Sequence, residues 1–399
     1  MIVHNLSELL QLQVELSRKI RVKKSTLSAT PKWHIHEGKL QHIPPAYFEV
    51  LAVQTSKGNS LMLHQPEQAI VLLLVAKNQG ERYFLLSIRA EPGLLKGVVF
   101  TSTIQSTPSN LQQIHEGAAT PYVEYLEPST NKVFETFEFD YTAFYLSKSK
   151  RFVVVELEEI FEPEENYVWV SEELMHSCLL VDDLLGTDLR ALFAHFCLVG
   201  SVLQSQMPRT ASDVEAKPIP FEQHPHLQNT DTGIRDVTTN QGASVEYFET
   251  STSIRETSNW IQPLVVLQTD GVAGLFWRKR NGQIEYALKK LTQVGIAPHD
   301  LWFPSFIQLP GEPTLFQIPS AARSVRANLE GGRFFQVSYL LFLCELHSSD
   351  GHLEGEIQYE WHSLDSIREI LTTPLSTSVE LRMVLSLALE EHLLQEVSK

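Results

Sequence analysis

An internal repeat is the feature of this sequence that most constrains its fold. Ala46–Glu49 reads Ala-Tyr-Phe-Glu and is echoed by Glu246–Glu249, which reads Glu-Tyr-Phe-Glu, at an offset of 200 residues. Phe100–Gln105 and Phe303–Gln308 share Phe-x-Ser-x-Ile-Gln at an offset of 203, and further landmarks follow in the same order. Because chance explains such ordered spacing poorly, we predict a tandem duplication of one folding unit.

The repeat sets the expected domain boundaries. We expect an N-terminal amphipathic helix in residues 1–32, a first copy in 33–200, a linker in 201–244 and a second copy in 245–399. Segment 1–32 has apolar residues at helical spacing followed by cations, which favours a packing or dimerisation helix over a membrane-surface helix. Segment 201–244 is polar and contains several prolines, which is typical of a linker or a mobile functional loop, and we favour the linker.

Within each copy the pattern predicts strands first and helices last. Ala69–Ala76 and Arg151–Leu157 are short, apolar, partly β-branched runs of the length of buried strands. Leu189–Cys197 follows Thr187-Asp188 and has apolar residues at helical spacing. Each copy is therefore expected to be a mixed α+β domain with a twisted sheet and flanking helices.

Charge and cysteine content narrow the possible partners and compartment. The formal net charge is −16, with 48 acids against 32 bases, which argues against a general binder of nucleic acid or anionic membranes. The three cysteines show no disulfide-rich or CxxC spacing, so we expect reduced thiols in the cytoplasm. No apolar run approaches the roughly 20 residues that span a bilayer. The motifs of P-loop enzymes, dinucleotide oxidoreductases and serine hydrolases are also absent from the sequence.

Residues 89–125 gather polar groups more densely than a core strand needs. Glu91 stands in a Glu-Pro-Gly turn, which presents the acid at a strand end, and an exposed turn acid is the bland alternative. His115 is the only histidine in this stretch and is a candidate general base or acid, although a lone histidine is more often structural. Tyr122, Glu124 and Tyr125 offer two phenols and a carboxylate for stacking on a nucleobase or bonding a ketone, or for plain packing.

Hydroxyls and arginines form two further candidate groups. The hydroxyl-rich run around Gln105 and Thr107 suits sugar hydroxyls or phosphate oxygens, unless it is an edge strand facing water. Arg190 and Arg382 occupy matching helix positions and are candidates for bidentate recognition of a diphosphate, with solvated helical arginines as the alternative. Trp33-His34-Ile35-His36 has no third ligand at useful spacing, so no metal site is expected.

Several motifs together resemble the NDP-hexose 2,3-dehydratases. The resemblance covers most of both copies and rests on these segments: Trp33–Phe48, His64–Pro66, Arg89–Gly93, Thr103–Thr107, His115–Gly117, Pro121–Tyr125 and Glu330–Phe334. It implies a duplicated Nudix-like fold, a homodimer, no redox cofactor and a nucleotide-linked 4-keto-6-deoxyhexose as substrate. It also implies 2,3-dehydration, in which a base removes the C3 hydrogen, the C2 hydroxyl leaves, and a 3,4-diketo-2,6-dideoxy sugar results.

The resemblance also assigns provisional roles. His115 or Glu91 would move protons, and Tyr122 or Tyr125 would donate to the ketone or enolate. The side chains expected to hold the substrate are Gln105, Thr107, Glu124, Tyr145, Arg151, Arg190, Arg333 and Arg382. Because the second copy has Thr292–Gly295 in place of the Glu-Pro-Gly turn, the first copy is expected to hold the active pocket. The alternative is a non-catalytic, or differently acting, sugar-nucleotide-binding protein of the same fold.

Overall fold

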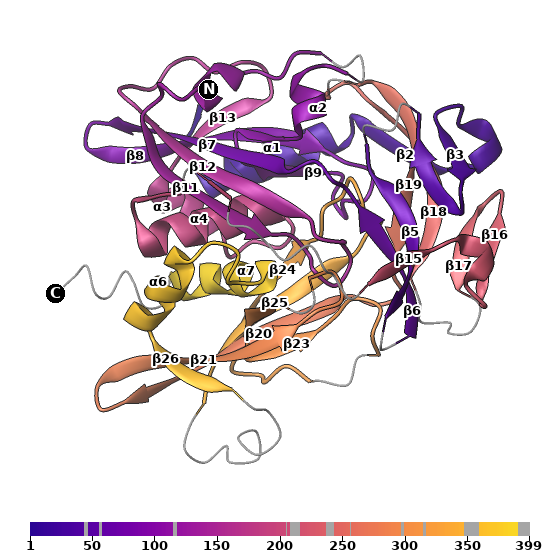
Figure 1. The fold of residues 1–399 in the computed structure, drawn as a ribbon. Helices are drawn as coiled ribbons and strands as arrows, with labels where there is room; N and C mark the ends of the chain where they lie inside the picture. The colour runs from indigo at the N-terminus through magenta and orange to yellow at the C-terminus, as the bar shows by residue number, and fades with distance from the viewer. Residues whose placement is uncertain are drawn as a thin grey trace.

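The computed structural model describes residues 1–43, 47–55, 58–114, 118–204, 206–207, 216–236, 243–255, 257–296, 299–313, 317–346 and 359–389. The chain is mixed α+β, with several sheets and few helices, as predicted. Figure 1 shows one large sheet above another, with helices between them on one side and smaller sheets on the other. No helix among the described residues combines the length and apolar character of a bilayer span.

The first large sheet is built around two long apolar strands. Its order is β1-β13-β8-β7-β12-β11-β14, with β9 beside β8 and β10 beside β7. Its strands are β1 (Ile2–Val3), β7 (Ala69–Asn78), β8 (Glu81–Ala90), β9 (Val98–Thr101), β10 (Ile104–Ser106), β11 (Lys132–Phe139), β12 (Ser149–Leu157), β13 (Tyr167–Ser171) and β14 (Val202–Leu203). Strands β7 and β12 run parallel in the interior, so they carry near-continuous apolar residues instead of alternating ones.

The second large sheet repeats the pairings of the first. Its order is β22-β21-β20-β25-β24, with β23 beside β20 and β26 beside β21. Its strands are β20 (Gly271–Arg280), β21 (Gln283–Thr292), β22 (Asp300–Pro304), β23 (Phe306–Gln308), β24 (Arg323–Asn328), β25 (Ser338–Glu345) and β26 (Glu360–Ser363). Here too a hairpin, β20–β21, pairs parallel with a later strand, β25, and antiparallel with a short strand, β23.

Two smaller sheets lie beside the large ones. One has the order β15-β5-β4-β3 with β6 on β5, and the other has the order β16-β17-β18-β19 with β2 on β18. Their strands are β2 (Ile20–Lys24), β3 (Trp33–His36), β4 (Lys39–His42), β5 (Glu49–Thr55), β6 (Gly58–His64), β15 (Lys217–Ile219), β16 (Leu227–Thr230), β17 (Gly233–Asp236), β18 (Ser244–Thr252) and β19 (Asn259–Val266).

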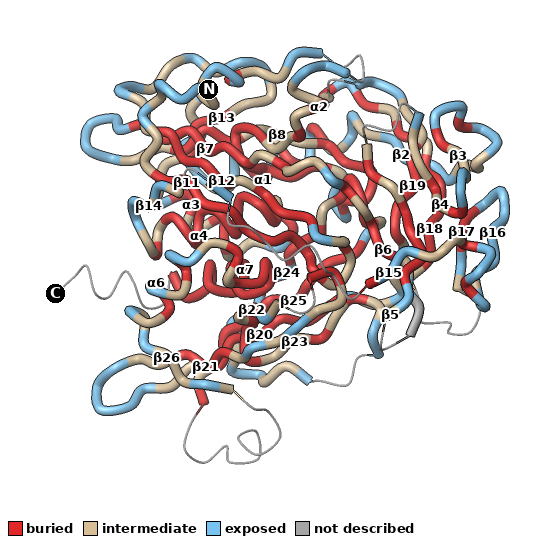
Figure 2. Tube along the Cα trace, viewed as in Figure 1, coloured by how far each residue is buried: buried red, intermediate tan, exposed pale blue. Residues whose placement is uncertain are grey.

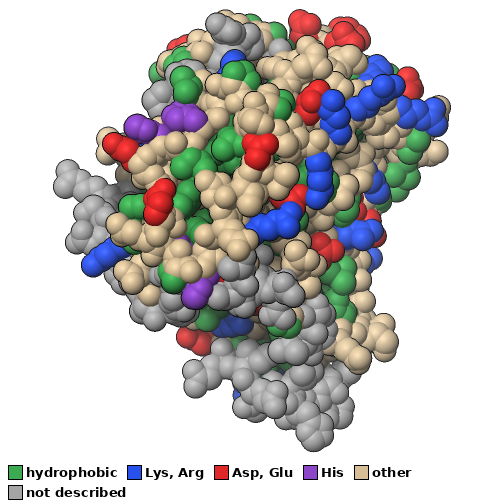
Figure 3. All heavy atoms as spheres, turned by 90° about the vertical axis from the view of Figure 1, so that its right-hand side faces the viewer, with side chains coloured by type: hydrophobic (Ala, Val, Ile, Leu, Met, Phe, Trp, Pro, Cys, Tyr) green, Lys and Arg blue, Asp and Glu red, His purple; other side chains and the backbone are tan. Residues whose placement is uncertain are grey.

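The N-terminal segment is only partly helical. Helix α1 (Leu6–Ser17) begins at the N-cap Asn5 and has Arg18 as its C-cap, but three of the cationic residues that were expected to end it, Arg21, Lys23 and Lys24, lie in β2. Strand β2 pairs with β18, and Lys24 and Lys23 form ion pairs with Glu246 and Glu249 at 2.6 and 3.0 Å. Strand pairing and these ion pairs therefore replace the predicted helix dipole contact. Figure 3 shows Lys and Arg side chains close to Asp and Glu side chains on this face.

The described part of segment 201–244 contains strands rather than a structureless linker. It contributes β14 to the first large sheet and β15 to β5, while β16 and β17 extend β18. These strands could not be recognised from the sequence, because short edge strands with exposed faces carry little periodic apolar signal.

Helices α4 (Thr187–Val199) and α7 (Val379–Ala388) connect the two large sheets, because α4 contacts β7 and β9 while α7 contacts β20, β22 and β25. The other described helices after α1 are α2 (Pro108–Leu111), α3 (Glu172–Cys178) and α6 (Leu364–Thr372), and short 3-10 turns cover Leu27–Ala29, Val123–Leu126 and Phe221–Gln223. Helices α4 and α7 pack against each other, and one hydrophobic cluster runs through residues of both halves. Figure 2 shows this buried interior along β7, β12, α4 and α7.

Candidate functional site

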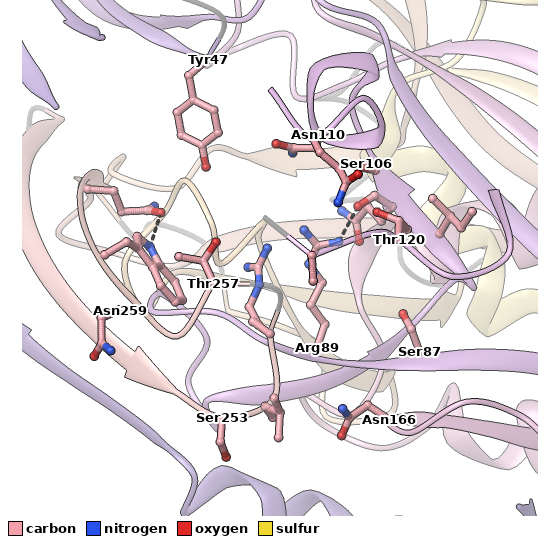
Figure 4. Close-up of a pocket in the computed structure, with 18 of the residues that line it drawn as sticks. Tyr47, Ser87, Arg89, Ser106, Asn110, Thr120, Asn166, Ser253, Thr257 and Asn259 are labelled. Carbon is pink, nitrogen blue, oxygen red and sulfur yellow. Dashed lines mark hydrogen bonds between the residues drawn. The ribbon is translucent and has the colours of Figure 1, made fainter. Parts of the chain in front are cut away.

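A cavity of about 760 Å³ lies between the first large sheet and the β18–β19 hairpin. Its wall takes residues from β3, β4, β8, β10 and β13 of the first half, and from β18, β19 and their connecting turn. This volume is within the range of sites that bind small molecules and cofactors. Both halves of the chain therefore build one pocket (Figure 4).

Two arginines of the cavity wall meet at one carboxylate that lies behind the lining. Arg89 Nε lies 2.8 Å and Arg255 Nη1 lies 3.6 Å from Oε1 of Glu91. The Glu91 side chain is 8% exposed, whereas the two arginine side chains are about a fifth exposed at 21% and 20%. Arg89 Nη1 also donates to the carbonyl of Gln105, so several bonds fix the plane of its guanidinium. The trio carries two positive charges and one negative charge, and both arginines line the cavity.

The Glu-Pro-Gly turn places Glu91 by joining the two halves of the chain. The Gly93 amide donates to the Gly331 carbonyl at 2.8 Å, and the Gln336 amide donates to the Gly93 carbonyl at 2.7 Å. A Cβ atom on Gly93 would lie 1.6 Å from the carbonyl oxygen of Phe334. Glycine is therefore required here by the close approach of another backbone.

Aromatic rings line one end of the cavity. The Trp33 ring centroid lies 5.9 Å from that of Tyr47 and 5.2 Å from that of His42. From the second half, Trp260 lies 5.6 Å from the Arg255 guanidinium carbon and donates to Oε1 of Gln262 at 2.8 Å. Rings of this kind suit stacking on a flat heterocycle.

Hydroxyls and amides line the other end. Figure 4 shows Tyr47 and Asn259 on one side of Arg89, and Ser87, Ser106 and Thr120 on the other. The polar end of the cavity is lined by Ser87, Thr103, Ser106, Asn110, Thr120, Asn166 and Tyr167. Such groups suit the hydroxyls of a sugar.

A buried ionic chain supports the wall from behind. The Gln105 amide donates to Oδ2 of Asp188 at 2.6 Å, and Lys150 bonds Oδ1 of the same carboxylate at 2.6 Å. Lys150 also pairs with Asp140 at 3.0 Å, and Lys148 pairs with Asp140 at 2.8 Å. Burial would raise the pKa of Asp140, but Lys148 and Lys150 together hold it below its ordinary value. Gln105, which was expected to hold sugar, does line the cavity, but its amide nitrogen donates to Asp188.

The hydroxyl run is buried and does not face water, although β9 and β10 on either side of it each pair with one strand. Thr101, Ser102 and Thr103 are each at most 1% exposed. The Thr103 hydroxyl donates to the carbonyl of Leu85 at 2.6 Å and accepts from the amide of Leu74 at 2.9 Å. Thr107, also a predicted sugar ligand, has its hydroxyl 3.1 Å from that of Ser109 and is not part of the cavity lining. These hydroxyls stabilise the crossing of β10 over β7 and β8.

Tyr122, Glu124 and Tyr125 lie beside the cavity and are not part of its lining. The Tyr122 oxygen accepts from the amide of Glu164 at 2.7 Å, and burial raises the pKa of this phenol. Its ring packs edge-on against Tyr167 at 4.9 Å, so the packing alternative describes Tyr122 best. His115, the other catalytic candidate, lies outside the described residues.

The two helical arginines are buried, bond other parts of the protein and are not part of the cavity lining. Arg190 is 0% exposed and donates to the carbonyl of Leu179 at 2.8 Å and to Ser386 at 3.0 Å. Arg382 is 1% exposed and donates to Glu138 at 2.9 Å and to the carbonyl of Phe139 at 2.8 Å. The matching positions reflect a shared role in tying α4 and α7 to neighbouring elements, because helix packing buries both guanidinium groups.

Three further predicted substrate residues also have internal partners. Arg151 pairs with Glu135 at 2.5 Å, and the Tyr145 hydroxyl donates to Glu330 at 2.8 Å. Arg333 donates to Gln65 at 3.2 Å and lies 5.0 Å from the Tyr47 ring, so it supports the aromatic end from behind. None of these three residues belongs to the described lining of the cavity.

Sequence reasoning missed the residues that the second half contributes. Arg255 and Trp260 belong to the turn and strand after β18, whereas the catalytic residues predicted from the sequence all lie in residues 89–125. The signal was available as Ile254-Arg255-Glu256-Thr257, a charged turn in one copy only. Tyr167 was missed because it reads as an ordinary strand residue before Trp169.

Comparisons with known proteins agree on one family. A model of the NDP-hexose 2,3-dehydratase family matches residues 7–196. A dTDP-4-dehydro-6-deoxy-alpha-D-glucopyranose 2,3-dehydratase from Saccharopolyspora spinosa is 22% identical over 410 aligned positions, which cover 87% of this chain and 83% of that protein.

Proteins with the same name from Streptomyces violaceoruber and Amycolatopsis orientalis are 27% and 23% identical, over 33% and 44% of this chain and 31% and 39% of their own lengths. A chain of the crystal structure of the complex between the C-terminal domain of mouse MUTYH and human PCNA is 15% identical and covers 36% of this chain and 95% of that chain, but its TM-score of 0.22 is too low to inform the fold. Residues 7–196 therefore match the NDP-hexose 2,3-dehydratase family, and most of the chain is similar, at low identity, to an enzyme named as a 2,3-dehydratase.

Proposed function

We propose that this protein removes water across C2 and C3 of a dTDP-linked 4-keto-6-deoxyhexose. The observation that carries the proposal is the pair of arginines on Glu91, midway between an aromatic end and a hydroxyl-rich end of one cavity. A nucleotide sugar has the same order of parts: a base, a diphosphate and a hexose. The similarity to enzymes named as dTDP-4-dehydro-6-deoxy-alpha-D-glucopyranose 2,3-dehydratases supports the choice of substrate.

Electrostatics favour Arg89 and Arg255 as the diphosphate site. The whole chain carries a formal charge of −16, so an anionic ligand needs local cations to bind. Guanidinium groups match phosphate oxygens in a bidentate way, and partial burial strengthens each charge-assisted bond. Glu91 holds the two arginines together before the ligand arrives, which reduces the reorganisation needed on binding.

The proposed reaction balances without an added oxidant or reductant. The C4 ketone acidifies the C3 hydrogen, a base takes that proton, and the electron pair passes through an enolate as the C2–O bond breaks. The hydroxyl leaves with a proton as water, and the resulting enol at C3 becomes a ketone when C2 takes up a proton. The product is a 3,4-diketo-2,6-dideoxy sugar still attached to the nucleotide.

The cavity suggests how the reaction's roles are shared. His115 remains our candidate for proton transfer, with a contribution of about 10²–10⁴ in rate. Glu91 is better suited to holding Arg89 and Arg255 than to accepting a proton from carbon, because both guanidinium groups engage its carboxylate. Tyr167 lines the cavity, so it replaces Tyr122 and Tyr125 as the phenol that would donate to the ketone or enolate oxygen.

We further propose that the fold is a tandem duplication of a Nudix-like domain, with copies in residues 33–200 and 245–399. Hydroxyls at the same place in the strand register support this proposal: Ser305 accepts from the amide of Phe276 at 2.7 Å, as Thr103 does from Leu74 at 2.9 Å. The strand pairing thus shifts by one residue from the Phe-x-Ser-x-Ile-Gln match, which aligns Ser305 with Ser102. Equivalent turns do so too, because the Gly295 amide donates to the Thr142 carbonyl at 2.9 Å, as Gly93 does to Gly331 at 2.8 Å. Family resemblance adds a homodimer, which light scattering would test, and the free cysteines are compatible with the cytoplasm.

A trapping assay tests the proposed reaction. The purified protein is incubated with dTDP-4-keto-6-deoxyglucose and an aromatic 1,2-diamine, which condenses with neighbouring ketones. We expect a quinoxaline adduct whose mass shows the loss of one water from the sugar. An Arg89→Gln variant should form the adduct more slowly at limiting substrate. Tight binding of the nucleotide sugar without any adduct would instead support a binding protein that lacks this activity.

A further inference from the structure

The cavity's two arginines occupy different places along its length. A series of contacts runs from the aromatic end to the polar end: Trp260 contacts Arg255, Arg255 contacts Glu91, and Glu91 contacts Arg89. Arg89 then bonds the carbonyl of Gln105, which is followed by Ser106 of the polar end. Arg255 is therefore the arginine of the aromatic end, and Arg89 is the arginine of the polar end.

The two arginines also come from different halves of the chain. Arg255 stands on the turn between β18 and β19, whereas Arg89 stands near the end of β8. The corresponding β5–β6 hairpin of the first half turns from Thr55 to Gly58, while the β18–β19 turn spans from Thr252 to Asn259. The longer turn of the second half brings the Arg255 guanidinium into the cavity that both halves build.

We infer that the nucleotide sugar lies in one direction in this cavity, with Arg255 reading the phosphate attached to the nucleoside and Arg89 reading the phosphate attached to the hexose. This inference rests on the proposed function and adds to it the orientation of the ligand. The base then stacks at the end lined by Trp33, Tyr47 and Trp260. The reacting hexose lies against Ser87, Ser106, Asn110 and Asn166, next to Tyr167.

The inferred orientation has a chemical consequence. The C4 ketone and the C2 and C3 groups must lie at the polar end, where the side chains are hydroxyls, amides and a phenol. The opposite orientation would put the reacting carbons among Trp33, Tyr47 and Trp260, away from Tyr167 and from the hydroxyls and amides that suit a sugar. Both halves would therefore recognise the nucleotide, with Arg255 and Trp260 from the second half, and residues of the first half would hold the sugar for reaction.

A series of three ligands measures the affinity contributed by each phosphate separately. Dissociation constants are measured for thymidine, thymidine monophosphate and thymidine diphosphate with the full-length wild type, Arg255→Gln and Arg89→Gln. The affinity gained from thymidine to the monophosphate reports the first phosphate, and the further gain to the diphosphate reports the second. We expect Arg255→Gln to reduce the first gain about tenfold and to spare the second, and Arg89→Gln to do the reverse.

Matched variants separate recognition from folding. Arg82 lies on the same strand as Arg89 and pairs with Glu172 at 2.9 Å, but it does not line the cavity, so Arg82→Gln should leave both gains unchanged. Arg255→Lys and Arg89→Lys keep the charge and should show smaller losses in the same gain as the glutamine variant.

The inference would be overturned if Arg255→Gln reduced the gain from the second phosphate and Arg89→Gln reduced the gain from the first. It would also be overturned if both variants reduced the same gain equally, or if neither variant reduced either gain. A wild type that gains nothing from either phosphate would overturn it as well. If the trapping assay fails while the affinity gains follow the predicted pattern, only the proposed reaction is refuted, because the affinity measurements do not depend on turnover.

Discussion

Gly93→Ala tests whether the joint between the two halves holds the site together. The added Cβ would lie 1.6 Å from the Phe334 carbonyl oxygen, where an ordinary contact needs about 3.5 Å. Relief requires the turn to move away, which stretches the bonds from Gly93 to Gly331 and from Gln336 to Gly93. Two backbone hydrogen bonds at about 1 kcal/mol each, plus overpacking of about 1–3 kcal/mol, predict a loss of roughly 3–5 kcal/mol.

The assay is urea unfolding together with binding of thymidine diphosphate. In thermal unfolding, the same loss of free energy of unfolding should lower Tm by about 4–6 °C for a chain of this length that unfolds cooperatively. Gly332→Ala is the matched control at the same joint, because its Cβ would meet only the Glu91 side chain, at 3.4 Å. It should cost less than about 1 kcal/mol.

Gly295→Ala separates stability from binding. Its Cβ would lie 1.9 Å from the Tyr145 carbonyl oxygen, so we expect a destabilisation similar to that of Gly93→Ala. Gly295 is not next to Glu91, however, so only Gly93→Ala should also weaken thymidine diphosphate binding. Equal stability of Gly93→Ala and Gly332→Ala would refute the reasoning about this joint, and equal effects of Gly93→Ala and Gly295→Ala on binding would refute its link to the arginine pair.

Three further predictions concern buried groups. Arg382→Met should destabilise the protein by about 3–5 kcal/mol in urea unfolding, because it leaves the Glu138 carboxylate buried without its cation; a loss below 1 kcal/mol would contradict this. Burial raises the pKa of Glu138 to about 7 despite Arg382, so the folded state holds an extra proton and its stability should fall as pH rises from about 4.5 to above 7. Glu138→Gln should flatten that fall in unfolding experiments at pH 5 and 8, and an unchanged slope would count against it. Tyr122→Phe should keep most of the adduct formation, whereas Tyr167→Phe should lower kcat at least tenfold; the opposite ranking in the trapping assay would refute the placement of these phenols.

The large elements could be predicted because their signals are local or repeated. Ala69–Ala76 and Arg151–Leu157 lie within β7 and β12, where continuous apolar residues reflect burial on both faces. Thr187-Asp188 opens α4 as its spacing indicated. Strands β2, β14 and β15 could not be predicted in this way, because their pairing partners are distant in sequence.

The site was only partly predictable, because a motif does not say which way its side chains point. Glu91 was found through its turn, but the sequence does not show that Arg89 and Arg255 bind its carboxylate. Gln105 looked like a sugar ligand until its amide was seen to bond Asp188. Arg190 and Arg382 looked like anion-binding groups for the same reason, since a buried guanidinium bonding carbonyls has no signature of its own in the sequence.

Isotope tracing of the sugar carbons tests the proposed dehydration most directly. The substrate is dTDP-4-keto-6-deoxyglucose labelled with deuterium at C3 and with heavy oxygen in the C2 hydroxyl, and the trapped product is weighed by mass spectrometry. We predict that both labels leave the sugar, and that the product formed in deuterated water from unlabelled substrate carries a solvent deuterium at C2. A product that keeps the C3 deuterium or the heavy C2 oxygen would contradict 2,3-dehydration by this protein.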